Sequence, residues 1–102
     1  MTGASMDERL YIVTYDIGDP KRWRAVFKLM NGYGEWAQLS VFQCRLSRRR
    51  HADMIATLDQ IIHHADDHVL IIDIGLAERV DPKVVSLGKR SFEPIERAPL
   101  IV

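Results

Sequence analysis

The order of strand-like and helix-like segments constrains the fold of this chain more than any other feature. Segments rich in apolar, β-branched and aromatic residues predict strands. They lie at Arg9–Tyr15, Trp36–Leu46 and His68–Ile74, with a break expected near Leu39–Ser40 that splits the middle one. A helical pattern fills each gap between them. The order β-α-β-β-α-β predicts an α+β domain of the ferredoxin-like, split β-α-β type.

Capping signals mark where both helices begin. Asp19 is a good N-cap, and Pro20 sits at a first helical position that tolerates proline. An apolar stripe at helical spacing follows, made of Trp23, Val26, Phe27 and Met30. Ser47 caps the second helix, which is expected to run to about His64.

The length of 102 residues fits one domain. We expect a flexible lead over residues 1–8 and a single domain over 9–102. Two helices on one face of the sheet leave the other face bare, which favours a homodimer with the sheets packed face to face. The apolar segment Pro99–Val102 has no local partner. We expect its last residues, 100–102, to form a strand that extends the sheet of the partner subunit.

Hydropathy and cysteine content indicate a soluble protein of a reducing compartment. No apolar run approaches the roughly 20 residues that a membrane-spanning helix needs. Cys44 is the only cysteine and is expected to be a buried, apolar residue. The cytoplasm is the expected location.

Net charge is zero, with 14 basic and 14 acidic residues, which by itself argues against a general nucleic-acid binder. The charges are unevenly placed, because residues 21–50 contain a single acid, Glu35. The basic residues of this stretch are Lys21, Arg22, Arg24, Lys28, Arg45, Arg48, Arg49 and Arg50. They predict a basic face that contacts nucleic-acid backbones; an ordinary solvated helix face is the alternative.

Asp16 is the candidate catalytic and metal-binding residue. It ends the first predicted strand and precedes a Gly-Asp-Pro loop. Near a dimer axis Asp16 would face the same residue of the second subunit. Two carboxylates can hold a Mg²⁺ ion that keeps several bound waters. Such an ion can activate water and neutralise a phosphoryl transition state. The alternative is that Asp16 only caps a turn.

Other chemically suggestive residues have plainer explanations. The segment His63–His68 has the composition of a metal site, but its residues are too crowded to converge on one ion, so a solvated helix end is favoured. Tyr33 and Trp36 lie beside glycines, where stacking against bases is an open alternative.

Several motifs lie along the chain: Tyr15-Asp16-Ile17, Arg22 and Arg24, Gly34 followed by Gln38-Leu39-Ser40-Val41-Phe42, Asp67-x-Val69, Val85-x-Leu87-Gly88 and the apolar C-terminal strand. Together these motifs resemble the CRISPR-associated protein 2 family. The resemblance implies a ferredoxin-like homodimer that holds duplex DNA during CRISPR adaptation, with integrase subunits bound to it. It also implies metal-dependent endonuclease activity on single-stranded RNA or duplex DNA.

Carried over by residue, the resemblance makes Asp16 the Mg²⁺ ligand, while Tyr15 and Phe42 match supporting family positions. The chain departs from the family where Glu35-Trp36-Ala37 replaces a segment that usually carries a basic residue, and where Gln43 replaces a frequent glutamate. Both changes remove charge near the expected site.

Three functions follow in order of preference. The first is a DNA-holding subunit of spacer acquisition, and the second is a metal-dependent phosphodiesterase. The third is a ferredoxin-like module that senses a small molecule, which the neutral net charge would suit.

Overall fold

The computed structural model describes residues 7–88. Its elements are β1 (Arg9–Asp16), α1 (Pro20–Asn31), β2 (Glu35–Gln38), β3 (Val41–Leu46), α2 (Arg48–Ile61) and β4 (His68–Leu76), followed by a short 3₁₀ helix, Ala77–Arg79. The predicted order is confirmed, including the break at residues 39–40. Residues 1–6 of the expected lead, which spans 1–8, and the expected strand at 100–102 lie outside the described residues. Over residues 7–88, no helix has the length and apolarity to cross a membrane.

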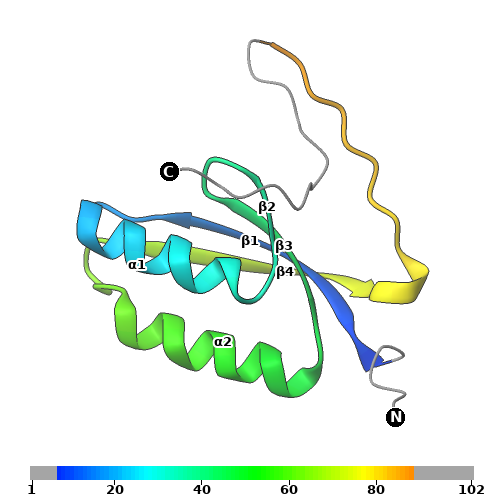
Figure 1. Cartoon of the computed structure of the whole chain (residues 1–102), viewed down its shortest axis with the longest axis horizontal. Coiled ribbons are helices and arrows are strands. Elements are labelled where there is room, and N and C mark those ends of the chain that lie inside the picture. The colour runs from blue at the N-terminus through cyan, green and yellow to red at the C-terminus, as the bar shows by residue number, and fades with distance from the viewer. Residues whose placement is uncertain (1–6, 89–102) are drawn as a thin grey trace.

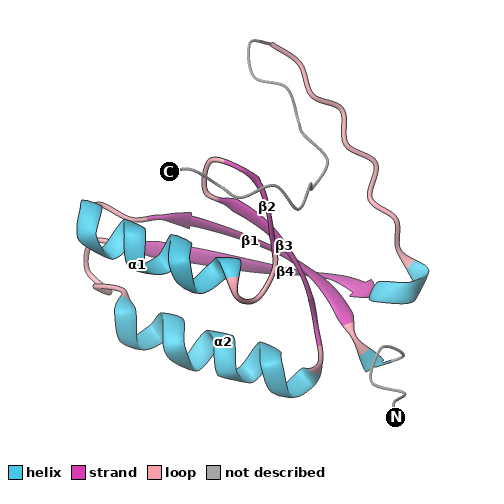
Figure 2. Ribbon diagram, in the orientation of Figure 1, coloured by secondary structure: helices cyan, strands magenta, loops and turns pink. Residues whose placement is uncertain are grey.

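The four strands form one sheet in the order β2-β3-β1-β4, and each neighbouring pair is antiparallel. Both helices lie on the same side of this sheet (Figures 1 and 2). This is the ferredoxin-like arrangement that the sequence predicts. It places β1 between two strands that come much later in the chain.

Both predicted caps are confirmed. The Asp19 carboxylate accepts a hydrogen bond from the Arg22 backbone N–H at 3.0 Å, and the Ser47 hydroxyl accepts one from the Arg50 backbone N–H at 3.2 Å. Helix α2 ends at Ile61, before the expected end near His64. The reason is local, because the His63 N–H donates to the Asp67 carboxylate at 2.9 Å instead of to a helical carbonyl.

The hydrophobic core lies between the sheet and the helices. Tyr11, Val13 and Tyr15 alternate along β1 on the covered face and are buried. Antiparallel pairing sets Phe42 opposite Val13 and Cys44 opposite Tyr11, so β3 adds to the same core. The helices contribute further buried side chains, namely Val26, Phe27, Met30, Met54 and Leu58.

Gly34 allows the start of β2 to approach β3 closely. A Cβ atom at this position would collide with the Cys44 sulfur and the Gln43 carbonyl. Any side chain would therefore force the two strands apart, which gives a physical reason for the glycine in this motif.

The opposite face of the sheet, here called the open face, carries no helix and exposes aliphatic side chains. On β4, Leu70 is 46% exposed, Ile72 42% and Ile74 39%. In the sheet register Ile72 lies opposite Ile12, and Leu70 lies opposite Thr14. Since side chains alternate across a strand, Leu70 and Ile72 share one face with Ile12 and Thr14, and Ile74 lies where the pairing with β1 shifts by one residue.

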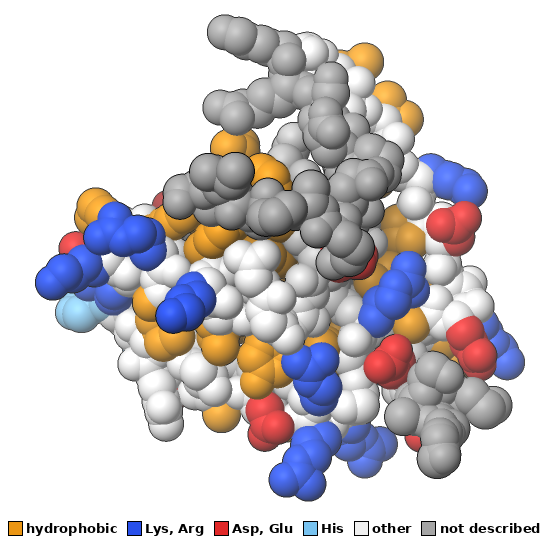
Figure 3. Space-filling view, viewed as in Figure 1, with side chains coloured by type: hydrophobic (Ala, Val, Ile, Leu, Met, Phe, Trp, Pro, Cys, Tyr) orange, Lys and Arg blue, Asp and Glu red, His pale blue; other side chains and the backbone are white. Residues whose placement is uncertain are grey.

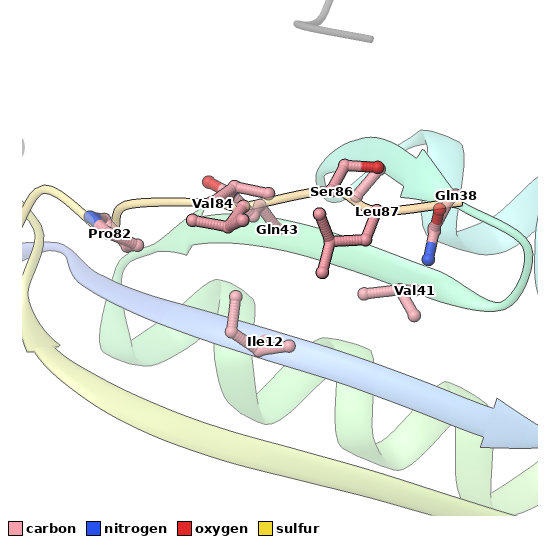
Figure 4. A pocket seen from close by; sticks show the side chains of 10 residues that line it. Ile12, Gln38, Val41, Gln43, Pro82, Val84, Ser86 and Leu87 are labelled. Carbon is pink, nitrogen blue, oxygen red and sulfur yellow. The ribbon is translucent and has the colours of Figure 1, made fainter. Parts of the chain in front are cut away.

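An extended segment after the 3₁₀ helix borders part of the open face. It and the strands enclose a groove of about 610 Å³. The groove is lined by Ile12, Ala37, Gln38, Val41, Gln43, Pro82, Val84, Val85, Ser86 and Leu87. Figure 4 shows Leu87 directed toward Val41 and Ile12.

Candidate functional site

Asp16 is the last residue of β1, and its side chain is exposed. It lies directly opposite His68, the first residue of β4. By strand alternation Asp16 shares the open face with Ile12 and Thr14. The candidate carboxylate therefore stands at one end of the uncovered side of the sheet.

The backbone around Asp16 is held on both sides. Before it, the Tyr15 N–H donates to the Ser40 carbonyl at 3.2 Å. After it, the Gly18 N–H donates to the Asp67 carboxylate at 3.1 Å. The loop that carries Asp16 into α1 is thus tied to the hairpin β2–β3 and to the start of β4.

Asp67 is the most heavily bonded carboxylate described. Its side chain is 0% exposed and pairs with Arg22, the Nε of which donates at 2.7 Å and a terminal nitrogen at 3.2 Å. The Gly18 and His63 N–H groups complete the set. The Arg22 hydrogen bond first, and the His63 N–H second, hold the pKa of the Asp67 carboxyl well below its usual range.

The two histidines His63 and His64 of this segment pair with different aspartates and do not converge on one position. His63 pairs with Asp66 at 3.2 Å, and His64 pairs with Asp59 at 3.1 Å, in two exposed contacts. Across residues 7–88, no three His, Cys, Asp or Glu side chains gather as a metal site would require.

The donor chemistry at Asp16 fits Mg²⁺ only if a second subunit contributes. An exposed carboxylate at a strand end offers the hard oxygen ligand that Mg²⁺ prefers and leaves room for bound waters. The oxygens of Asp67 are already taken by four donors. Among residues 7–88 Asp16 belongs to no cluster of three metal-binding side chains, so two Asp16 side chains would have to meet across a dimer axis to hold the ion.

The basic residues of α1 separate into two kinds. Lys21, Arg24 and Lys28 are exposed, whereas Arg22 turns toward Asp67. In Figure 3, Lys and Arg side chains gather over the beginning of α1, at the left of the view. Lys21, Arg24 and Lys28 can meet a polyanion, while Arg22 is held in an intramolecular ion pair.

The arginines around the start of α2 also differ among themselves. Arg48 and Arg49 are exposed. Arg50 donates to the Gly32 carbonyl at 2.8 Å and lies over the Tyr33 ring at 4.7 Å, which links the two helices. Arg45 donates to the Ala77 carbonyl at 3.2 Å. The predicted basic face therefore consists of two groups, one along α1 and one around the start of α2.

Tyr15 and Phe42 are core residues behind the Asp16 end of the sheet. Their rings lie 6.2 Å apart, and both side chains are buried. Burial raises the pKa of Tyr15 to about 12, and within residues 7–88 the Tyr15 hydroxyl has no hydrogen-bond partner. Burial also raises the pKa of Cys44 to about 12, as befits a buried thiol. These residues support the site through packing.

Tyr33 and Trp36, the alternatives for base stacking, are engaged within the chain. Arg50 covers the Tyr33 ring. The Trp36 indole donates to the Leu39 carbonyl at 2.8 Å, and its ring meets Phe27 edge to face.

The structural role of Asp67 was not predicted. The sequence indicates this residue only as part of the His63–His68 segment and of the Asp67-x-Val69 motif. The available signal was the acid pair Asp66-Asp67 just before a strand, together with an arginine in the first turn of α1. Only the sheet order brings Asp67 beside Arg22, 45 residues away.

Comparisons with known proteins agree with this geometry. The family profile described as "CRISPR associated protein Cas2" matches residues 9–80. A Geobacter sulfurreducens protein named "CRISPR-associated endoribonuclease Cas2" is 58% identical over 93% of this chain and 99% of its own length. A Rhodospirillum rubrum protein, "CRISPR-associated endoribonuclease Cas2 1", is 54% identical over 99% of this chain and 98% of its own.

Solved structures of the same family resemble this chain as well. A structure titled "Crystal structure of cas2" superimposes with a TM-score of 0.68 at 33% identity, covering 86% of this chain and 98% of the other. The Streptococcus pyogenes Cas2 structure at pH 6.5 has a TM-score of 0.62 at 33% identity, covering 74% of this chain and 99% of the other. With its fold, its motifs and its full-length relatives in agreement, this chain belongs to the Cas2 family of CRISPR-associated proteins.

Proposed function

We propose that this protein is a homodimeric subunit of CRISPR spacer acquisition that holds duplex DNA by its backbone and bridges integrase subunits in the prokaryotic cytoplasm. The observation that carries the proposal is the division of the molecule into an apolar open face and a helix layer with exposed cations. A dimer formed through the open faces would bury Leu70 and Ile72 and turn both helix layers outward. The exposed cations would then be displayed on both sides.

The cations that we assign to DNA are those whose side chains are exposed and lack a described internal carbonyl or carboxylate partner. They are Lys21, Arg24 and Lys28 on α1 and Arg48 and Arg49 on α2. Contacts of this kind neutralise phosphates without reading base sequence. Duplex affinity should therefore fall steeply as salt rises.

The experiment is the salt dependence of duplex binding for the wild type and for a Lys21→Gln, Arg24→Gln double variant. For each subunit that contacts the duplex, we expect the slope of log affinity against log salt to fall by about two, because that subunit loses two phosphate contacts. Lys83→Gln is the matched control, since Lys83 is exposed but pairs with Asp81 away from the helices. A flat salt response of the wild type would refute the proposal.

Endoribonuclease activity is the second candidate, because the two relatives above carry that name and Asp16 is an exposed carboxylate at the end of β1. A Mg²⁺ ion held between two Asp16 side chains would supply an activated water and stabilise charge on the phosphate. Asp16 itself would bind and orient the ion.

Cleavage of labelled RNA and duplex DNA, with Mg²⁺ and with a chelator, tests this activity. We expect Asp16→Asn to abolish metal-dependent cleavage while the dimer persists. Asp59→Asn, the same chemical change at an exposed carboxylate of α2, should cleave like the wild type. Equal cleavage by the wild type and Asp16→Asn would assign the activity to a contaminant.

A further inference from the structure

Arg22 and Arg24 stand two residues apart on α1, yet their surroundings differ. Arg24 is exposed. The Arg22 side chain is 29% exposed, and its guanidinium donates to both oxygens of Asp67 in a two-pronged contact. Such fork-to-carboxylate pairs are among the strongest charge-assisted hydrogen bonds.

If Arg22 left Asp67 to contact a phosphate, the Asp67 carboxylate would lose its cationic partner. The Asp67 side chain is 0% exposed, so it could not regain water in place of the guanidinium. A buried charge left without its partner is strongly destabilising. Arg22 is therefore unsuited to a contact that forms and breaks with each nucleic acid.

The same ion pair fixes the backbone on both strands beside Asp16. The Asp67 carboxylate binds the N–H of Gly18, two residues after Asp16. Asp67 also immediately precedes His68, which lies opposite Asp16 in the sheet. The bond to the His63 N–H ties this unit to the end of α2.

We propose that Arg22 and Asp67 form a clamp that positions Asp16, and that Arg22 makes no phosphate contact. This inference rests on the proposed function, because it concerns how the Asp16 end of the molecule is held for nucleic acid. Arg22 and Asp67 are positioning residues, and they act as a pair.

Salt dependence separates a clamp from a phosphate contact. For duplex DNA, Arg24→Gln should reduce the salt slope by about one for each subunit that contacts the duplex, whereas Arg22→Gln should leave the slope at the wild-type value even if overall affinity falls. The Arg22→Gln, Asp67→Asn double variant should show the salt slope of the wild type and no greater loss of affinity than the worse single variant. A slope lowered by about one for each contacting subunit in Arg22→Gln would overturn the inference.

Backbone amide NMR tests the clamp directly and needs no nucleic acid. In Arg22→Lys and in Asp67→Asn, the signals of Asp16, Gly18 and His63 should shift, because lysine lacks the fork and asparagine lacks the charge. The signals of the core residues Met54 and Leu58 should stay in place, which a general loss of structure would not allow. Arg24→Lys is the matched control and should shift none of these signals.

The binding experiment and the NMR experiment test the proposed function and the clamp separately. If the wild type fails to bind nucleic acid, the proposed function falls while the NMR arm still tests the clamp. Unchanged Asp16 and Gly18 signals in both Arg22→Lys and Asp67→Asn would overturn the clamp whatever the binding data show. Should Arg22→Gln fail to fold, Arg22→Lys carries the test, since it retains the charge.

Discussion

The two faces of the sheet are formed by the same strands but have different roles. On β1, Tyr11, Val13 and Tyr15 pack under the helices, while Ile12, Thr14 and Asp16 point the other way. The covered face carries the core, and the open face carries exposed aliphatic side chains and the candidate carboxylate. One strand therefore supplies both stability and the proposed site, separated only by the alternation of side chains.

The two aspartates at this end of the sheet show the same division. Asp67 is enclosed on the helix side and bonded to Arg22, Gly18 and His63. Asp16 stands exposed on the other side. A carboxylate whose lone pairs are all used holds structure, and one open to solvent is available for a ligand.

The largest effect is expected on the covered face. Phe42→Ala removes a fully buried ring and should lower the free energy of unfolding by about 3–5 kcal/mol. Urea denaturation measures the change. Ile55→Ala, at a residue 41% exposed on α2, is the control and should cost less than about 1 kcal/mol. A similar loss of unfolding free energy in both variants would contradict the expected difference between covered and exposed positions.

The open face should instead control association. Ile72→Asp places a charge on that face in both subunits, and should weaken dimerisation by about 100-fold while the monomer stays folded. Sedimentation over a range of protein concentrations measures the dissociation constant. Ile55→Asp changes an equally exposed isoleucine on the helix layer and should leave the dimer intact. Dissociation by Ile55→Asp alone would place the interface on the helices.

The smallest effect concerns the pH dependence of the buried aspartate. The folded-state pKa of Asp67 is lowered, so its contribution to stability is complete above an unfolded-state pKa of about 3.9 and is lost as pH falls further. The free energy of unfolding of the wild type should therefore decline more steeply than that of Asp67→Asn below about pH 4. Urea titrations at several pH values check this. Parallel curves would mean that the Arg22–Asp67 pair contributes nothing that depends on charge.

Local sequence signals were enough to predict the architecture. Caps at Asp19 and Ser47, the helical stripe beginning at Trp23 and the strand pattern of β1 each act over a few residues, and all are confirmed. The end of α2 was predicted too late because its cause is a contact of the Asp67 side chain with the His63 N–H, which the helical pattern does not reveal.

The site was only partly predictable for the same reason. The placement of Asp16 at a strand end follows from its neighbours in sequence. The engagement of Arg22 depends on β4 lying beside β1, and nothing near Arg22 in the sequence indicates it. Arg22 and Arg24 carry the same formal charge, and only the packing shows that Arg22 is held in an ion pair while Arg24 is exposed.

The position of β1 in the sheet also constrains how the chain can fold as it is synthesised. The strand is made first, but its neighbours come from residues 41–46 and 68–76. Until Leu76 has left the ribosome, one edge of this apolar strand stays unpaired. Pairing between such distant segments is slow, and unpaired edges promote aggregation. Rapid translation through β4 would therefore protect the newborn chain, and a pause before β4 would leave that edge of β1 unpaired for longer.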